Sequence, residues 1–490
     1  MMIKRPNYTK IAVCFLIIFL CRQNGVVFSQ NLPLLPYPQQ IIEQREVFNM
    51  NEFVPVFQRR NASLEEQKSI WTLCEGFESI FGTPLKITDK EKGNIIVLRN
   101  LSREKPTKKE MKTILPVGEE GYQLNITSDK IEIIANSDAG LFYGSQTLLQ
   151  LLRTASLTGT IKCMTINDMP SSARRYLCYN WDTEHIPTFN YIKQLIQSAA
   201  HFKLNGIAFL NDSLSTPFSE MELFYLKKFS ETYHVDIVTT TRNFLDMQIL
   251  NVNLKNKIYP EFQQSAKTIF PPFSKEDGDK ITVFHNSGAA LFIDSWYAML
   301  WSAELSWNQP KENALTIMKQ RQEQYEKSLD RQFFNVDFAL CEQLKSFDSL
   351  QIISLSEQDF WRPVTPTNTS YTHNPTNNQL VLTRALTLEK TLQLLAESAP
   401  IAHDEILYSM IFASQRAEFI ALKNLLQESF TQQSTAPNAI HETVDMLLEN
   451  IRHLKQAHQT LWSIENNNAF PDNIAQKYDQ MIAELETLKI

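Results

Sequence analysis

The chain has 490 residues, enough for two or three domains, and its formal net charge of −7 argues against a polyanionic ligand such as nucleic acid. It contains only twelve glycines and neither a P-loop nor a GxGxxG stretch, so we expect no nucleotide cofactor. The six cysteines have no CxxC spacing, and those beyond the leader are expected to be small buried residues rather than metal ligands or a disulfide framework.

Residues 1–29 predict a secretion signal. Basic Lys4, Arg5 and Lys10 precede the apolar run IAVCFLIIFL, which is too short to cross a bilayer, and VFS before Gln30 offers a cleavage site. An uncleaved anchor is the alternative. No later apolar run is long enough for a membrane span, so we expect an exported protein, periplasmic or extracellular.

Residues 30–168 predict a compact α/β domain that follows a proline-rich entry. Two alternating runs joined by TSD predict a hairpin, and apolar residues at helical spacing predict helices. The expected elements are helices at 65–81 and 139–152 and strands at 94–98, 122–126 and 130–135.

Residues 169–355 alternate strand and helix patterns, which favours a parallel sheet or a barrel. The sequence predicts four strands, at 176–179, 206–210, 235–239 and 281–284, and helices at 189–202, 220–233 and 294–307.

Residues 356–380 are rich in Pro, Thr, Ser and Asn and predict a linker, and residues 381–490 predict a C-terminal α-helical bundle. Its expected helices lie at 386–396, 404–430, 439–462 and 474–488. The adjacent acids Asp404 and Glu405 begin one of these helices, where they favour the positive end of the helix dipole.

The stretch EGYQLNITSDKIEIIANSDAGLFYGSQTLLQLL, residues 120–152, resembles the N-terminal accessory domain of glycoside hydrolase family 20, which includes the β-N-acetylhexosaminidases. The resemblance implies a zincin-like fold without metal chemistry of its own. Consistently, the chain has no HExxH motif, and we expect no metal site and no cofactor.

The next stretch, RYLCYNWDTEHIP with KLN at 203–205, is similar to the opening of the family's catalytic domain. The resemblance implies that Arg175 holds sugar hydroxyls, a role that suits a guanidinium fork. Asn180 stands in place of the family's aspartate, whereas Asp212 follows the strand GIAFL, where a barrel presents ligand groups.

The family's catalytic Asp-Glu pair is not found in the part of the chain where the resemblance implies it. In that family the glutamate is the general acid and the aspartate orients the substrate's own acetamido nucleophile. The stretch from Arg175 to Pro310 is also shorter than the about 200 residues of a full eight-unit barrel. We therefore expect a reduced or incomplete (β/α) TIM-type barrel, with its open edge covered by the bundle or a partner.

LWSAELSWNQP, residues 300–310, resembles the helix that closes the family's barrel, which implies that Glu304 and Trp307 are structural. An alternative alignment needs an insertion and places Trp301 and Glu304 at the family's sugar-stacking tryptophan and its partner glutamate.

Trp181 is the preferred sugar platform because it lies at a strand end, whereas tryptophans on helices are usually part of the core. Asp182 and Glu184, two residues apart, could form the acid and base of a glycosidase, although solvated loop carboxylates are the plainer interpretation. With Asp212 they are the weak catalytic candidates. Substrate binding is assigned to Arg175, Trp181 and Asp212.

Three functional hypotheses follow. The first is a relative of β-N-acetylhexosaminidases that binds glycans with a terminal N-acetylhexosamine and has lost catalysis. The second is an active exo-hexosaminidase with rewired acids, and the third is a structural or assembly protein without glycan binding.

Overall fold

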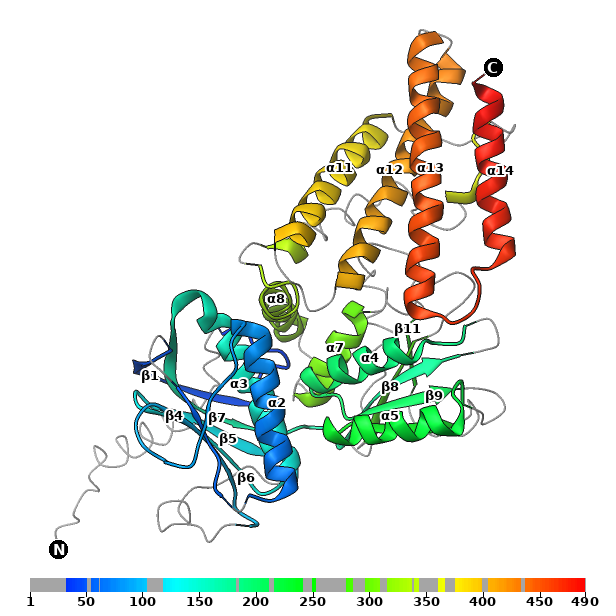
Figure 1. Cartoon of the computed structure of the whole chain (residues 1–490). Helices are drawn as coiled ribbons and strands as arrows, with labels where there is room; N and C mark the ends of the chain where they lie inside the picture. The colour runs from blue at the N-terminus through cyan, green and yellow to red at the C-terminus, as the bar shows by residue number, and fades with distance from the viewer. Residues whose placement is uncertain are drawn as a thin grey trace, which may run out of the picture.

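The computed structural model describes residues 32–50, 54–60, 62–103, 118–181, 185–210, 216–240, 249–252, 279–284, 296–308, 315–336, 339–342, 360–365, 375–398, 404–432 and 437–489. Within these residues, two β-sheets are followed by a set of long helices that rises from the second sheet (Figure 1). No helix in the described residues is both long and apolar enough to cross a membrane.

The first sheet is mixed, with the strand order β1-β7-β5-β6-β4-β2-β3. Its strands are β1 (Gln40–Asn49), β2 (Val56–Phe57), β3 (Ile87–Thr88), β4 (Ile95–Asn100), β5 (Tyr122–Ile126), β6 (Lys130–Ala135) and β7 (Thr160–Asp168). The predicted hairpin is confirmed, since β5 and β6 pair antiparallel with Tyr122 opposite Ala135. Strand alternation explains this element, because apolar side chains recur at every second position.

Helices α2 (Leu64–Phe81) and α3 (Asp138–Thr158) accompany the first sheet. α2 begins with a capping box between Ser63 and Glu66, which satisfies two backbone N–H groups at the helix start. α3 packs closely on the sheet because Gly144 has no side chain: a Cβ there would lie 2.5 Å from Ile133 Cγ2. This close packing holds α3 in a fixed position on the first sheet.

The second sheet has five parallel strands in the order β10-β9-β8-β12-β11. They are β8 (Arg174–Asn180), β9 (Gly206–Leu210), β10 (Asp236–Thr240), β11 (Ile249–Val252) and β12 (Asp279–Phe284). The sequence predicted four of them and missed β11, whose four residues are too few for a clear periodicity. β8 is the central strand, so its carboxyl end is the best-positioned place for a site.

The helices of this part are α4 (Phe189–His201), α5 (Glu220–Thr232), α7 (Trp296–Trp307) and α8 (Leu315–Gln332). α4 and α5 start at Thr188 and Ser219, whose side-chain oxygens accept a hydrogen bond from the first turn. α8 was not predicted, because its sequence is largely polar and carries little apolar periodicity.

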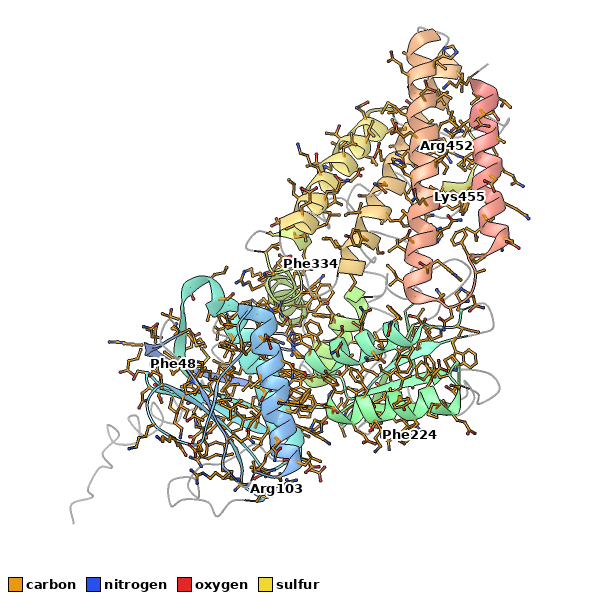
Figure 2. All side chains as sticks on the ribbon, viewed as in Figure 1. Phe48, Arg103, Phe224, Phe334, Arg452 and Lys455 are labelled. Carbon is orange, nitrogen blue, oxygen red and sulfur yellow. The ribbon has the colours of Figure 1, made fainter. Side chains whose placement is uncertain are left out.

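Four long helices form the C-terminal helical region: α11 (Pro375–Ser398), α12 (Asp404–Gln432), α13 (Pro437–Glu465) and α14 (Asp472–Leu488). Ion pairs between Arg452 and Glu486 and between Lys455 and Asp479 join α13 to α14, and Figure 2 labels the two basic residues. These pairs are exposed, so each contributes little to stability.

The predicted linker at residues 356–380 needs correction in its described parts. α11 begins inside it at Pro375, a residue that the first turn of a helix tolerates because it needs no N–H there. Phe360 and Val364 are fully buried, and the Lys423 ammonium donates to the Phe360 carbonyl at 2.8 Å. The polar composition of the segment obscured these two apolar residues, which attach the segment to α12.

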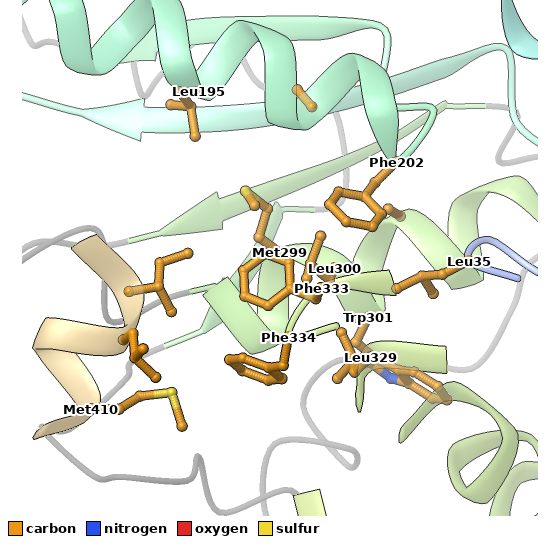
Figure 3. Packing of buried hydrophobic residues seen from close by; sticks show 14 of the residues in the cluster. Leu35, Leu195, Phe202, Met299, Leu300, Trp301, Leu329, Phe333, Phe334 and Met410 are labelled. Carbon is orange, nitrogen blue, oxygen red and sulfur yellow. The ribbon is translucent and has the colours of Figure 1, made fainter. Parts of the chain in front are cut away.

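The second sheet and the helical region share a hydrophobic core. Figure 3 shows Leu195 of α4, Met299 of α7, Phe333 at the end of α8 and Met410 of α12 gathered around it. Met299, Phe333 and Met410 are each at most 4% exposed. The C-terminal helices are therefore packed onto the second sheet through continuous apolar contact rather than tethered beside it.

Glu418 on α12 predicts a pH-dependent stability. Burial, and then the neighbouring Glu389 carboxylate on α11, raise the pKa of Glu418 from 4.5 to about 7. Because the folded pKa exceeds the unfolded one, the stability that this group contributes is full below pH 4.5 and is lost as the pH rises through about 7. We expect the melting temperature of Glu418→Gln to exceed that of the wild type at pH 8 and to depend less on pH between 5 and 8. Identical pH slopes would contradict this expectation.

Candidate functional site

A buried polar network joins the first sheet to the second. The Asp168 carboxylate, at the end of β7, accepts hydrogen bonds from Tyr122 (2.7 Å), the Trp307 indole (3.0 Å) and the Lys203 ammonium (3.0 Å). Lys203 and Asp168 are each 1% exposed. These hydrogen bonds join β5, β7, α7 and the segment after α4, so the network ties the two sheets together.

Arg175 lies beside this network at the amino end of β8. Its guanidinium makes a bidentate pair with Glu120 from the loop before β5, at 2.7 and 3.1 Å. It also donates to the carbonyls of Lys203 (2.8 Å) and Ser172 (2.7 Å), and it is 1% exposed. The Trp307 ring covers its face at 4.9 Å.

This position corrects the role that the resemblance implied for Arg175. A residue that holds sugar hydroxyls needs free donors at the carboxyl end of the strands, whereas Arg175 lies at the opposite end with donors already bonded to protein acceptors. The sequence alone could not predict the pair between Arg175 and Glu120, because the two residues lie 55 positions apart in the chain.

Glu304 and Trp307 are structural, in agreement with the preferred alignment. Glu304 is 2% exposed, accepts from the Tyr37 N–H at 2.7 Å and pairs with Arg321 at 3.2 Å. Burial raises the pKa of Glu304, although Arg321 opposes that rise. Both residues tie α7 to other elements and reach no open surface.

The carboxyl end of β8 meets the end of α13 in a short antiparallel contact. Asn466 bridges Pro187, the Thr188 N–H donates to the Glu465 carbonyl at 2.7 Å, and the Asn467 N–H donates to the Ile186 carbonyl at 2.8 Å. These backbone bonds hold the turn after α13 firmly on the segment that follows β8. The C-terminal helical region therefore supplies side chains to the strand end where parallel βα sheets place their ligands.

The β8–α13 joint, which we define as Tyr179, Trp181, His185, Glu465 and Asn466, combines side chains of several kinds. The Tyr179 hydroxyl donates to Glu465 Oε1 at 3.2 Å, and Glu465 is fully buried. Trp181 continues the alternation of Leu177 and Tyr179, so it lies on the same face of β8 as the residue that reaches Glu465.

Two members of the joint have polar atoms without a partner among the described residues. The Trp181 indole N–H has none although the side chain is 8% exposed, and neither the oxygen nor the nitrogen of the Asn466 amide has one at 3% exposure. An unpaired buried donor or acceptor costs about 1–3 kcal/mol. Such groups are typical of sites where a polar ligand or an ordered water supplies the missing bonds.

The sequence-based site candidates are thus divided. Trp181 lies in the joint, while Asp182, Glu184 and Asp212 lie outside the described residues. Glu465 and Asn466 were missed, because polar residues at a helix end and turn are usually solvated and only contact with β8 distinguishes them.

A cavity of about 960 Å³ lies elsewhere, along the edge strand β10. Its walls include residues 118–121, Asn205, His234 and Asp236. Two of its acids are already engaged: Glu120 holds Arg175, and Asp236 accepts from the Tyr176 hydroxyl at 2.7 Å. The cavity is also at the amino ends of the strands, so the β8–α13 joint is the better candidate.

Metal chemistry gains no support from the described ranges. They contain no group of three or more His, Cys, Asp or Glu side chains that could hold a metal ion. Cys163 and Cys341 are buried and Cys74 is half-buried, and all three are free thiols.

Comparison with known proteins matches residues 31–169 to the model of glycosyl hydrolase family 20, domain 2. The chain is 26% identical over 217 residues to a beta-hexosaminidase of Porphyromonas gingivalis, covering 41% of this chain and 26% of the relative. It is 28% identical over 158 residues to a lacto-N-biosidase of Bifidobacterium bifidum, covering 30% of this chain and 14% of the relative. The match thus spans about a quarter or less of these curated relatives.

Among solved structures, an N-acetyl-beta-hexosaminidase of Streptomyces plicatus is similar, with 20% sequence identity and a TM-score of 0.35. The similarity covers 42% of this chain and 45% of that chain.

Proposed function

We propose that this glycoside hydrolase family 20-like chain binds glycans that end in an N-acetylhexosamine, at the β8–α13 joint, and that it has lost glycoside hydrolysis. The proposal adds that the chain is exported and that its five parallel strands are the remains of an eight-unit barrel. The observation that carries the binding proposal is Trp181, an aromatic residue at the carboxyl end of the central strand whose buried indole N–H has no partner in the described residues.

The chemistry of the joint suits a sugar. An indole N–H donates to a hydroxyl oxygen, and this is the bond that the buried Trp181 side chain lacks. The Glu465 carboxylate, which Tyr179 of β8 contacts, can accept from hydroxyl groups, as it accepts from Tyr179 at 3.2 Å. These groups suit a neutral polyhydroxylated ligand.

The loss of hydrolysis is supported by the sequence. The catalytic glutamate and its adjacent aspartate have no counterpart in the part of the chain that resembles the family, and the strand region is shorter than a full barrel. The second hypothesis, an active exo-hexosaminidase, assigns the chemistry to Asp182, Glu184 or Asp212. It predicts turnover that one acid-to-amide change abolishes.

Replacing Trp181 tests the binding proposal. We expect saturable binding of N-acetylglucosamine to the wild type and at least tenfold weaker binding to Trp181→Ala, measured by isothermal titration calorimetry. Trp181→Phe keeps an aromatic face but loses the N–H, so it should bind several-fold more weakly than the wild type, in line with the about 1 kcal/mol of one hydrogen bond.

The matched control is Trp71→Ala on α2, because Trp71 is 69% exposed and far in sequence from the joint. It should bind like the wild type. If Trp181→Ala does not fold, Trp181→Phe still decides the question. Unchanged affinity in both Trp181 variants would refute the assignment.

A further inference from the structure

The cavity along β10 faces the edge of this strand rather than one of its two faces. Four consecutive residues, 235–238, line the cavity. Because successive side chains of a strand point to opposite faces, a cavity contacts four of them in a row only from the side of the strand. The volume of about 960 Å³ is within the range of ligand-binding pockets, about 300–1,000 Å³. The cavity therefore borders the backbone of β10.

The backbone of β10 presents hydrogen-bonding groups to this cavity. Within the described residues, β9 is the only strand that pairs with β10. The Asp236 N–H donates to the carbonyl of Asn205, directly before β9, at 2.9 Å. Because successive backbone groups of a strand point to alternate sides, the N–H and C=O of Ile237 point away from β9, toward the cavity. An edge of this kind is a template for one more strand.

Carboxylates without a counter-ion line the cavity. Glu119, in the loop before β5, and Asp236, at the start of β10, are exposed and have no ion pair in the described residues. The C-terminal end of α5 also lines the cavity, and its last turn carries no basic residue. The negative end of the helix dipole therefore adds to the two carboxylates and favours a cation.

Positive charge around the cavity is limited. Lys227 supplies one ammonium group, whereas Lys228 is engaged with Glu231 at 2.9 Å. Burial lowers the pKa of His234, so its ring is uncharged at neutral pH. One ammonium group thus faces two carboxylates and a helix end, and this balance favours a ligand that carries a basic group.

We propose that this cavity is a docking site for an extended peptide segment of a partner protein, which adds a strand to β10 and presents a basic side chain to Glu119 and Asp236. Hydrogen bonds to the backbone of Ile237 supply affinity, and the basic side chain supplies specificity. The site is separate from the β8–α13 joint, so the proposal is independent of sugar binding.

A second copy of this chain is a poorer occupant of the same edge. Pairing β10 with β10 of another copy through a two-fold axis places the same surface on both sides of the interface. Glu119 and Asp236 of one copy would then approach the same carboxylates of the other, and like charges brought together at an interface weaken binding. A basic peptide complements these charges instead.

The first test titrates the full chain with three peptides by isothermal titration calorimetry. We expect saturable binding of acetyl-TVRVT-amide and at least tenfold weaker binding of acetyl-TVEVT-amide, whose carboxylate approaches the acids of the cavity. The TVRVT peptide N-methylated at its three central residues should also bind at least tenfold more weakly, because it keeps its charge but loses the backbone N–H donors.

The second test replaces the two carboxylates. Glu119→Gln/Asp236→Asn should bind the TVRVT peptide three- to tenfold more weakly, as expected for the loss of two exposed charge pairs. Its melting temperature should stay unchanged, because both residues are exposed and asparagine still accepts from the Tyr176 hydroxyl. Glu220→Gln is the matched control: it lies at the other end of α5, outside the lining of the cavity, and should bind like the wild type.

Three results would overturn the proposal. The first is no saturable binding of the TVRVT peptide to the wild type. The second is equal affinity for the N-methylated peptide, which would show that the edge of β10 is not used. The third is unchanged affinity in the double variant, which would show that the carboxylates do not select the basic side chain. A protein that dimerises on its own and then excludes the peptide would favour the second copy instead.

Discussion

Replacing Asp168 by alanine is expected to lower the free energy of unfolding by about 3–5 kcal/mol, because it leaves the Lys203 ammonium buried without its counter-charge. Lys203 and Asp168 are each 1% exposed and lie 3.0 Å apart. The same change also removes the acceptor of the Tyr122 hydroxyl and the Trp307 indole. Chemical denaturation measures the effect directly.

The double variant Asp168→Ala/Lys203→Met separates charge burial from the other contacts. Replacing both members of a buried pair by apolar groups is often nearly neutral, so the double variant should recover part of the loss. Asp479→Ala is the exposed control: its pair with Lys455 lies at the surface, and the change should stay within about 0.5 kcal/mol. A loss in the Asp168 variant no larger than in this control would contradict the structural role of the network.

Arg175→Met is expected to cost about 3 kcal/mol of stability and to leave the sugar affinity of the folded protein unchanged. The change removes the bidentate pair with Glu120 and the guanidinium stacked under Trp307. Arg452→Met, whose residue forms an exposed pair with Glu486, is the matched control and should have little effect.

The same variant separates the two roles assigned to Arg175. If Arg175 links the two sheets, the free energy of unfolding of the variant falls and its affinity for N-acetylglucosamine stays the same. A large loss of N-acetylglucosamine affinity with unchanged stability would instead restore the role implied by the resemblance, in which Arg175 holds sugar hydroxyls.

Much of the local structure could be predicted from the sequence, because local signals determine it. The β5–β6 hairpin follows from alternation and a short polar turn, and strand β9 was predicted with its observed bounds, Gly206–Leu210. Helix α4 ends within one residue of its expected end, since its apolar face has a clear period.

Elements without a local signal were missed. β11 is too short for periodicity, α8 is too polar, and α11 begins in a stretch whose composition is typical of a linker. In each case tertiary packing stabilises an element whose own sequence has no clear helix or strand pattern.

The candidate site was only half predictable for a related reason. Trp181 could be selected because a strand end is a recognisable position, whereas Glu465 and Asn466 lie about 280 residues later, in a turn that contacts β8 only in the folded chain. For Arg175 the prediction failed in the opposite way. The motif implied a role in ligand binding, whereas the pair with the distant Glu120 indicates a structural role.

We propose that this chain binds a terminal N-acetylhexosamine without hydrolysing it. The most direct test is a titration of the wild type with p-nitrophenyl N-acetyl-β-glucosaminide in which heat and released nitrophenolate are followed together. We expect a saturable heat of binding and no nitrophenolate above the uncatalysed rate. Turnover of the glycoside, or the absence of any saturable heat, would contradict it.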